Sequence, residues 1–163
     1  MIILIVTFLS FILEYVVNGF FHGTIFSGLI IFSSLILLEP FFKKNKEKFF
    51  AFCFIVGFIY DFVYTGTYFM NAGIFLLVGV FVSFINSVTP NNFLVSVLEL
   101  VLMILFYRVI TFFFFAINGV VDFDFFLLFK SIYSSILMNL IYGIFLYFIL
   151  YFVSCYFNVK RIN

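Results

Sequence analysis

The chain has 163 residues, of which 67% are hydrophobic and only 9% are charged, and its formal net charge is +1. Soluble domains are about 45–50% apolar and about 25% charged, so a soluble chain of this size could not hide so much apolar surface from water. The near-neutral charge indicates no nucleic-acid partner, and the continuous apolar runs argue against a membrane β-barrel, which needs alternating residues. We therefore expect an all-α integral membrane protein.

Six apolar segments follow one another along the chain, and each is predicted to be a membrane-spanning helix. The last segment is longer than a straight crossing of about 30 Å requires, so it is either tilted or bent at Gly143. The chain is thus expected to form a single transmembrane domain over residues 1–163, folded as a six-helix bundle. The predicted spans are residues 2–17, 24–42, 49–64, 73–87, 93–116 and 125–157.

Basic residues predict how the bundle lies in the membrane. A cluster at residues 43–48 reads KKNKEK, and the chain ends with Lys160, Arg161 and two uncharged residues. Basic segments next to membrane spans remain in the cytoplasm, and six spans place these two segments on the same side. We expect both termini to be cytoplasmic and the loop with Asp122 and Asp124 to lie outside.

One stretch combines an apolar run with a buried acid and small residues. From Gly57 to Gly73 the sequence reads GFIYDFVYTGTYFMNAG. It places Asp61 inside an apolar run, where a carboxylate costs about 2.5–3.5 kcal/mol on insertion scales and usually faces a bundle interior. Gly66 and Asn71 follow before the next apolar run begins. The pattern predicts a tight helical hairpin with an acid near its tip, and we expect the rest of the chain to surround it.

Other intramembrane polar residues fall at two depths. Counted at about 1.5 Å per residue, Glu14 and Arg108 lie level with Asp61, where one cation and two carboxylates would form a buried charge network. Glu99 and Asn139 fall together nearer the cytoplasmic face. These groups could relay protons or lock helix packing and partner docking. We favour the locking role, because no titratable group bridges the two levels.

Catalytic and ligand-binding patterns are missing from the sequence. It contains one His, no cluster with metal-ligand spacing and no Gly-rich phosphate loop with its Lys. We therefore expect no catalytic, cofactor-binding or metal site, and a protein that is not an enzyme.

The hairpin resembles that of the bacterial rod-shape-determining MreD family. The family shows a Gly, an Asp four residues later, a polar turn and then Asn-Ala, here Gly57, Asp61, residues 65–67 and Asn71-Ala72. The length of the chain and its six predicted spans are similar to those of the family over the whole chain, and the motif covers residues 57–73. The family often has Gly two residues before the Asn-Ala pair, where this chain has Phe69.

The resemblance implies a non-enzymatic scaffold of the cell-wall elongation machinery in the bacterial plasma membrane, contributing to cell shape. Its implied partners are an MreC-like membrane protein and, further, RodA, its transpeptidase and MreB filaments. The intramembrane polar residues and the small residues of the hairpin are the candidates for structural or partner contacts. They are Glu14, Gly57, Asp61, Gly66, Asn71, Gly73, Glu99, Arg108 and Asn139.

A second resemblance is to the substrate-binding S components of energy-coupling-factor transporters, which also have six short spans. Those proteins capture a vitamin through polar outer loops that often contain Trp, and they dock through small-residue motifs on the first span. This chain has no Trp, and its first span offers only Thr7 and Ser10 as small residues. The transporter interpretation therefore ranks second.

Overall fold

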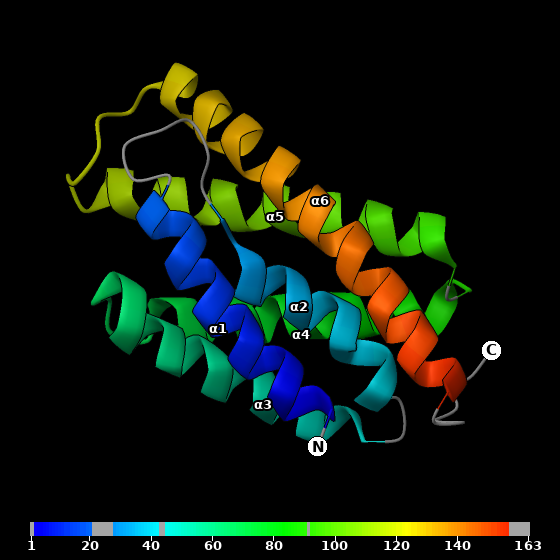
Figure 1. Cartoon of the computed structure of the whole chain (residues 1–163). Helices are drawn as coiled ribbons and strands as arrows, with labels where there is room; N and C mark the ends of the chain where they lie inside the picture. The colour runs from blue at the N-terminus through cyan, green and yellow to red at the C-terminus, as the bar shows by residue number, and fades with distance from the viewer. Residues whose placement is uncertain (1, 21–27, 43–44, 91, 157–163) are drawn as a thin grey trace.

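A computed structural model describes residues 2–20, 28–42, 45–90 and 92–156. Within these ranges 88% of the residues are helical and no strand occurs. The helices in chain order are α1 (Ile2–Phe20), α2 (Ile30–Leu38), η1 (Glu39–Phe42), α3 (Lys46–Tyr60), η2 (Asp61–Thr65), α4 (Met70–Val88), α5 (Phe93–Ile117) and α6 (Phe125–Tyr156) (Figure 1). The expected all-α fold is confirmed.

Five of the helical segments are long and apolar enough to cross a membrane, which supports a multi-pass membrane protein. They are α1, α3 continued through η2, α4, α5 and α6. The predicted second span, residues 24–42, begins outside the described residues, and its described helix is the shorter apolar segment Ile30–Phe42. Six spans with cytoplasmic termini therefore remain a prediction. The cytoplasmic position of the basic residues 43–44 and 160–161 also remains a prediction, because these residues lie outside the described ranges.

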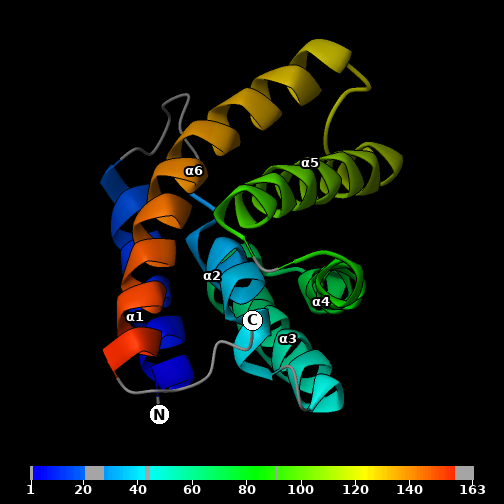
Figure 2. The same cartoon turned by 90° about the vertical axis from the view of Figure 1, so that its right-hand side faces the viewer.

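The short helix α2 lies at the centre of the bundle. All nine of its residues are buried, and it packs against α1, α4, α5 and α6. Figures 1 and 2 show it enclosed by these longer helices. A helix that is hydrophobic all round lies either in a protein core or in the membrane, and its contacts place α2 in the core. The expectation that the chain surrounds the α3–α4 hairpin is therefore wrong, because the core forms around α2 and the hairpin makes one side of it.

Helix α6 is one uninterrupted helix of 32 residues that contains Gly143. A β-carbon at Gly143 would lie 2.5 Å from Cδ1 of Leu100, which shows that this glycine lets α6 approach α5. Small residues at helix contacts are typical of membrane bundles, where lipid is as apolar as the side chains and close packing drives association.

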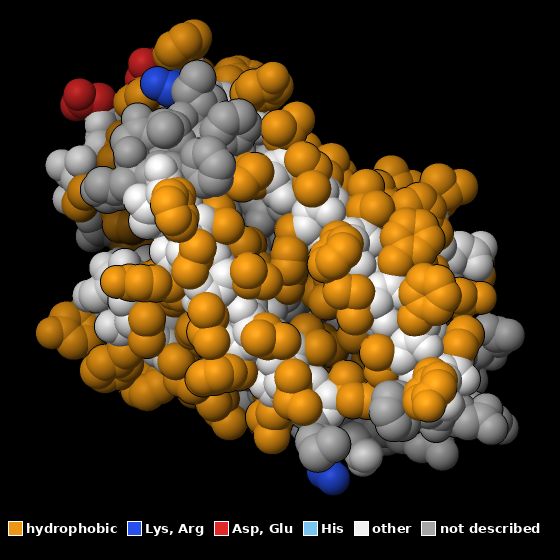
Figure 3. Space-filling model, viewed as in Figure 1, with side chains coloured by type: hydrophobic (Ala, Val, Ile, Leu, Met, Phe, Trp, Pro, Cys, Tyr) orange, Lys and Arg blue, Asp and Glu red, His pale blue; other side chains and the backbone are white. Residues whose placement is uncertain are grey.

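The outer surface of the bundle is apolar over its length. In Figure 3, hydrophobic side chains cover the face formed by α1 and α6, and the acidic and basic side chains in view lie at its two ends. The exposed side chains of α1 include Leu4 and Phe8, each 67% exposed, and those of α6 include Phe152, 69% exposed. Such a surface is compatible with lipid along the bundle and water at its ends.

Candidate functional site

The hairpin tip is organised by the carboxylate of Asp61. The last turn of the α3 segment is a π-helix that begins at Asp61, and π-helical turns are frequent at functional sites. Asp61 is buried, and its two oxygens face the first turn of α4. Oδ1 accepts the backbone N–H of Asn71 at 3.1 Å, and Oδ2 accepts that of Ala72 at 3.0 Å. A helix start leaves its first N–H groups unpaired and carries a partial positive charge. Asp61 therefore caps α4 from the neighbouring helix.

Polar side chains complete the shell around this carboxylate. Its Oδ1 also accepts hydrogen bonds from the Thr67 hydroxyl at 2.6 Å, the Thr65 hydroxyl at 3.2 Å and the Asn71 amide at 2.8 Å. The Tyr107 hydroxyl on α5 donates to Oδ1 of Asn71 at 2.8 Å. These bonds offset the cost of taking a carboxylate out of water and connect the hairpin to α5.

The backbone of the tip explains two of the predicted glycines and places Phe69 in a left-handed conformation. A β-carbon on Gly57 would lie 2.7 Å from both Cα of Ala72 and the carbonyl oxygen of Asn71, so only glycine allows this approach. Gly66 has φ 62° and ends the π-helix with its N–H bonded to the Asp61 carbonyl. Phe69 also has a left-handed backbone, with φ 58°. That conformation suits glycine and is strained for a residue with a β-carbon.

Gly73 differs from the other candidates of the hairpin. No atom lies within 4 Å of a β-carbon placed on it, so a larger residue fits there without a clash. The tip is therefore held by Gly57, Asp61, Gly66 and Asn71, and the close packing that makes Gly57 indispensable does not extend to Gly73.

A second carboxylate repeats the capping arrangement at α2. Glu14 on α1 is fully buried, and its Oε2 accepts the backbone N–H of Ile31 at 2.8 Å. Its Oε1 accepts the Tyr60 hydroxyl at 2.7 Å. Asn139 on α6 accepts the N–H of Leu29 at 2.8 Å. The start of the central helix is thus held by side chains from α1 and α6.

The predicted charge network differs in its contacts from what we expected. Among the described residues, the hydrogen bonds of Glu14 and Asp61 come from backbone N–H groups at helix starts, hydroxyls and an amide, while the positive charge of Arg108 attracts Glu14 through space. The half-buried Arg108 instead donates from Nε to the Ser135 hydroxyl at 2.6 Å, a bond between α5 and α6. The sequence indicates the depth of each charged residue along its own helix, but it does not show that unpaired backbone N–H groups inside the bundle bind the two acids.

Glu99 and Asn139 were expected at one level, but their described contacts differ. Asn139 bonds to the start of α2, beside the bonds of Glu14, because α2 starts deep in the bundle. Glu99 is buried on α5, and its Oε1 has no hydrogen-bond partner among the described residues. Another buried acid, Glu39, accepts the Asn86 amide at 2.9 Å and joins η1 to α4. The sequence analysis did not single out Glu39, Tyr60 or Tyr107, because a lone Glu beside Pro and two tyrosines among many aromatics give no distinctive pattern.

Two recesses lie outside this polar framework. A groove of about 610 Å³ runs between α1 and α6, with Ile30 of α2 also lining it. A smaller pocket of about 300 Å³ opens at the hairpin tip beside Asp61. The groove is lined by Val6, Leu9, Ile12, Leu13, Val17, Ile30, Met138, Ile141, Tyr142, Phe145, Leu146 and Ile149.

The hydrogen bonds of Asp61, Glu14, Asn139 and Arg108 join helices to one another. Among the described residues, no group of three or more His, Cys, Asp or Glu side chains could hold a metal ion. Comparisons with models of protein families, with curated proteins and with solved structures find no match to this chain.

Proposed function

We propose that this chain is an MreD-like membrane scaffold of the bacterial cell-wall elongation machinery, without catalytic activity, that binds an MreC-like membrane protein. The observation that carries the proposal is the contact between the two halves of the hairpin motif. Gly57 lies against Asn71 and Ala72, and Asp61 bonds to the backbone N–H groups of the same two residues. The residues on which the resemblance rests are therefore physically interdependent, which favours a shared hairpin over a chance match of scattered letters.

The groove between α1 and α6 is the surface that we assign to the partner. It is the larger of the two recesses described above, and its lining is almost wholly apolar. Helices associate in lipid by close packing, so a recess between two spans is suited to one further transmembrane helix. An MreC-like protein has a single span and would supply that helix. RodA, its transpeptidase and MreB would join the complex as further partners.

Site-specific photocrosslinking tests the partner and its position together. A photoreactive amino acid replaces Ile141 in the groove, and a matched control replaces Leu98 on α5, because both side chains are 62% exposed. After co-expression with a tagged MreC-like protein, we expect a crosslinked heterodimer from position 141 and none from position 98. Equal crosslinking from both positions would show that the partner does not bind specifically in the groove.

Purification of the wild-type chain decides between the scaffold and the transporter S component. The scaffold interpretation expects the tagged MreC-like protein to co-purify from mild detergent and no vitamin to be retained. If the purified chain retains a vitamin in stoichiometric amount and no membrane partner co-purifies, the chain is a transporter S component and the scaffold proposal is wrong.

The proposed orientation has its own test. Single cysteines at Asn45 and Asn118, in a variant without Cys53 and Cys155, are labelled in intact cells by a thiol reagent that does not cross membranes. We expect labelling at position 118 only, because the basic cluster next to Asn45 favours the cytoplasm. Labelling of both positions from outside would overturn the orientation.

A further inference from the structure

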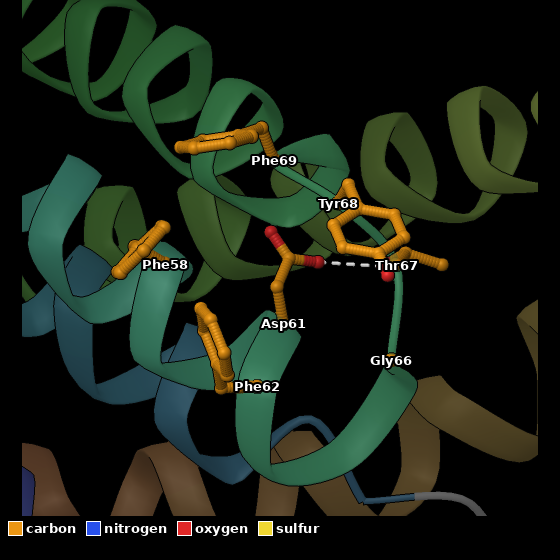
Figure 4. Close-up of a pocket in the computed structure, with 7 residues that line it drawn as sticks. All are labelled: Phe58, Asp61, Phe62, Gly66, Thr67, Tyr68 and Phe69. Atoms are coloured by element: carbon orange, nitrogen blue, oxygen red, sulfur yellow. Dashed lines mark hydrogen bonds between the residues drawn. The ribbon is translucent and has the colours of Figure 1, made fainter.

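The pocket at the hairpin tip combines an acid with a wall of aromatic rings. It measures about 300 Å³, which is at the lower end of small-ligand sites, and Phe58, Asp61, Phe62, Gly66, Thr67, Tyr68 and Phe69 line it. Figure 4 shows Phe58 and Phe62 on one side of Asp61, Phe69 above it and Tyr68 opposite. The Phe58 ring centroid lies 5.0 Å from that of Phe62 and 5.2 Å from that of Phe69. Three phenyl rings therefore form one continuous wall.

The carboxylate in this pocket retains both its charge and acceptor capacity. Its hydrogen-bond donors among the described residues are hydroxyl and amide groups, all of them neutral, so none of these donors cancels the negative charge. Within the described part of the chain, four of the five bonds go to Oδ1 and one, from the N–H of Ala72, goes to Oδ2. Figure 4 shows this second oxygen on the side of Phe58 and Phe69, away from Thr67. A carboxylate oxygen with a free lone pair thus faces the rings.

The position of Phe69 supports a role for the rings beyond anchoring the chain in the membrane. Phe69 adopts a left-handed backbone, which costs a residue with a β-carbon about 1–2 kcal/mol. Aromatic residues at membrane interfaces are common, and the exposure of Phe62 and Tyr68 alone would need no further explanation. An interfacial belt, however, does not require a strained backbone or rings gathered around a buried acid.

We propose that this pocket binds an ammonium group, either the headgroup of a zwitterionic lipid or a free small amine. Aromatic faces attract cations through their quadrupoles, and cages of aromatic residues are the usual site for quaternary ammonium groups. Asp61 supplies the opposite charge, and the tip of a hairpin between two spans places the pocket at headgroup level. An anion is excluded by the carboxylate, and a purely apolar ligand would leave Oδ2 unused. This site is independent of the partner groove between α1 and α6.

Intrinsic fluorescence tests the proposal directly, because the chain contains no Trp. Phe62→Trp places one reporter in the pocket wall, and Phe84→Trp, on the far part of α4 and 66% exposed, is the control. The purified full chain in detergent is titrated with tetramethylammonium chloride against sodium chloride at equal ionic strength. We expect a saturable change for Phe62→Trp that sodium does not produce, and no saturable change for Phe84→Trp. A Phe62→Trp response that is identical for the two salts would overturn the proposal.

Two further variants separate binding from folding. Phe58→Leu retains an apolar side chain and leaves the bonds of Asp61 intact, so its loss of affinity measures the ring face, about 2- to 30-fold for one cation–π contact. Asp61→Asn keeps an acceptor for the start of α4 and removes the charge, and we expect a loss of at least tenfold. Helical content and melting temperature are recorded for both. Unchanged affinity in both folded variants would contradict the assignment.

Lipid composition distinguishes the two sources of the ammonium group. The Phe62→Trp protein is placed in nanodiscs of phosphatidylglycerol alone or with phosphatidylethanolamine. If a headgroup occupies the pocket, phosphatidylethanolamine will compete and raise the tetramethylammonium concentration required for half-saturation. If that concentration is the same in both lipids while binding remains saturable, the ligand is a free amine. Absence of saturable binding in both lipids would refute the site.

Discussion

Replacing Gly57 with alanine should destabilise the hairpin, whereas the same replacement at Gly73 should not. The β-carbon introduced at position 57 would lie 2.7 Å from two backbone atoms of Asn71 and Ala72, and at position 73 it would meet no atom within 4 Å. Carbon atoms pack best at about 3.5–4.0 Å, so the start of α4 would have to move by about 1 Å. The atoms that must move belong to the residues whose N–H groups donate to Asp61.

The expected loss follows from three contributions. Overpacking costs about 1–3 kcal/mol, and lengthening the two hydrogen bonds to a carboxylate adds about 1 kcal/mol or more. Alanine in place of glycine within a helix returns about 1 kcal/mol. The net loss for Gly57→Ala is therefore roughly 2 kcal/mol, and Gly73→Ala should gain up to about 1 kcal/mol. The two variants carry the same chemical change, so the difference between them reports the tertiary contact.

Reversible unfolding in mixed micelles measures both variants. The purified chain in mild detergent is titrated with a denaturing detergent, and the loss of helical circular dichroism gives the free energy of unfolding. If Gly57→Ala is within about 0.5 kcal/mol of Gly73→Ala, the size of an ordinary neutral surface substitution, then the tight approach of α3 to α4 does not exist. The same outcome would weaken the argument that the motif residues depend on one another.

The same unfolding assay gives three more predictions. Asp61→Ala and Asn71→Ala should be non-additive by about 0.5–3 kcal/mol, because the two side chains share a hydrogen bond, and additive losses would show that the bond contributes nothing. Glu14→Leu should lose more stability than Glu14→Gln. Leucine leaves the buried donors of Ile31 and Tyr60 unpaired at about 1–3 kcal/mol each, whereas glutamine keeps one acceptor. Equal losses would contradict the cap on α2. Gly143→Ala should destabilise the chain mildly, because the new β-carbon meets only the end of the Leu100 side chain. In a chain that already carries Leu100→Ala, adding Gly143→Ala should cost no further stability. If it still does, another contact is responsible.

The amino-acid sequence by itself determined the class of protein and the outline of its helices. The six apolar segments correspond to helices found within the described residues, since α-helix formation depends on long local runs of apolar residues. The hairpin motif was also visible, because Gly57, Asp61 and Asn71 are near one another in the chain. Local interactions of this kind are encoded within a few turns of helix.

The tertiary structure alone decided which helix is central and what the buried acids bind. In a soluble protein the apolar face of each helix points to the core, but here every face is apolar, and lipid competes equally with protein for it. The hydrophobic pattern therefore does not indicate which face of a helix points to the core, and it could not show that α2 lies inside. The directions come instead from the few polar groups, since Glu14 and Asp61 must reach unpaired N–H groups at helix starts on other segments, and those contacts exist only once the bundle has assembled.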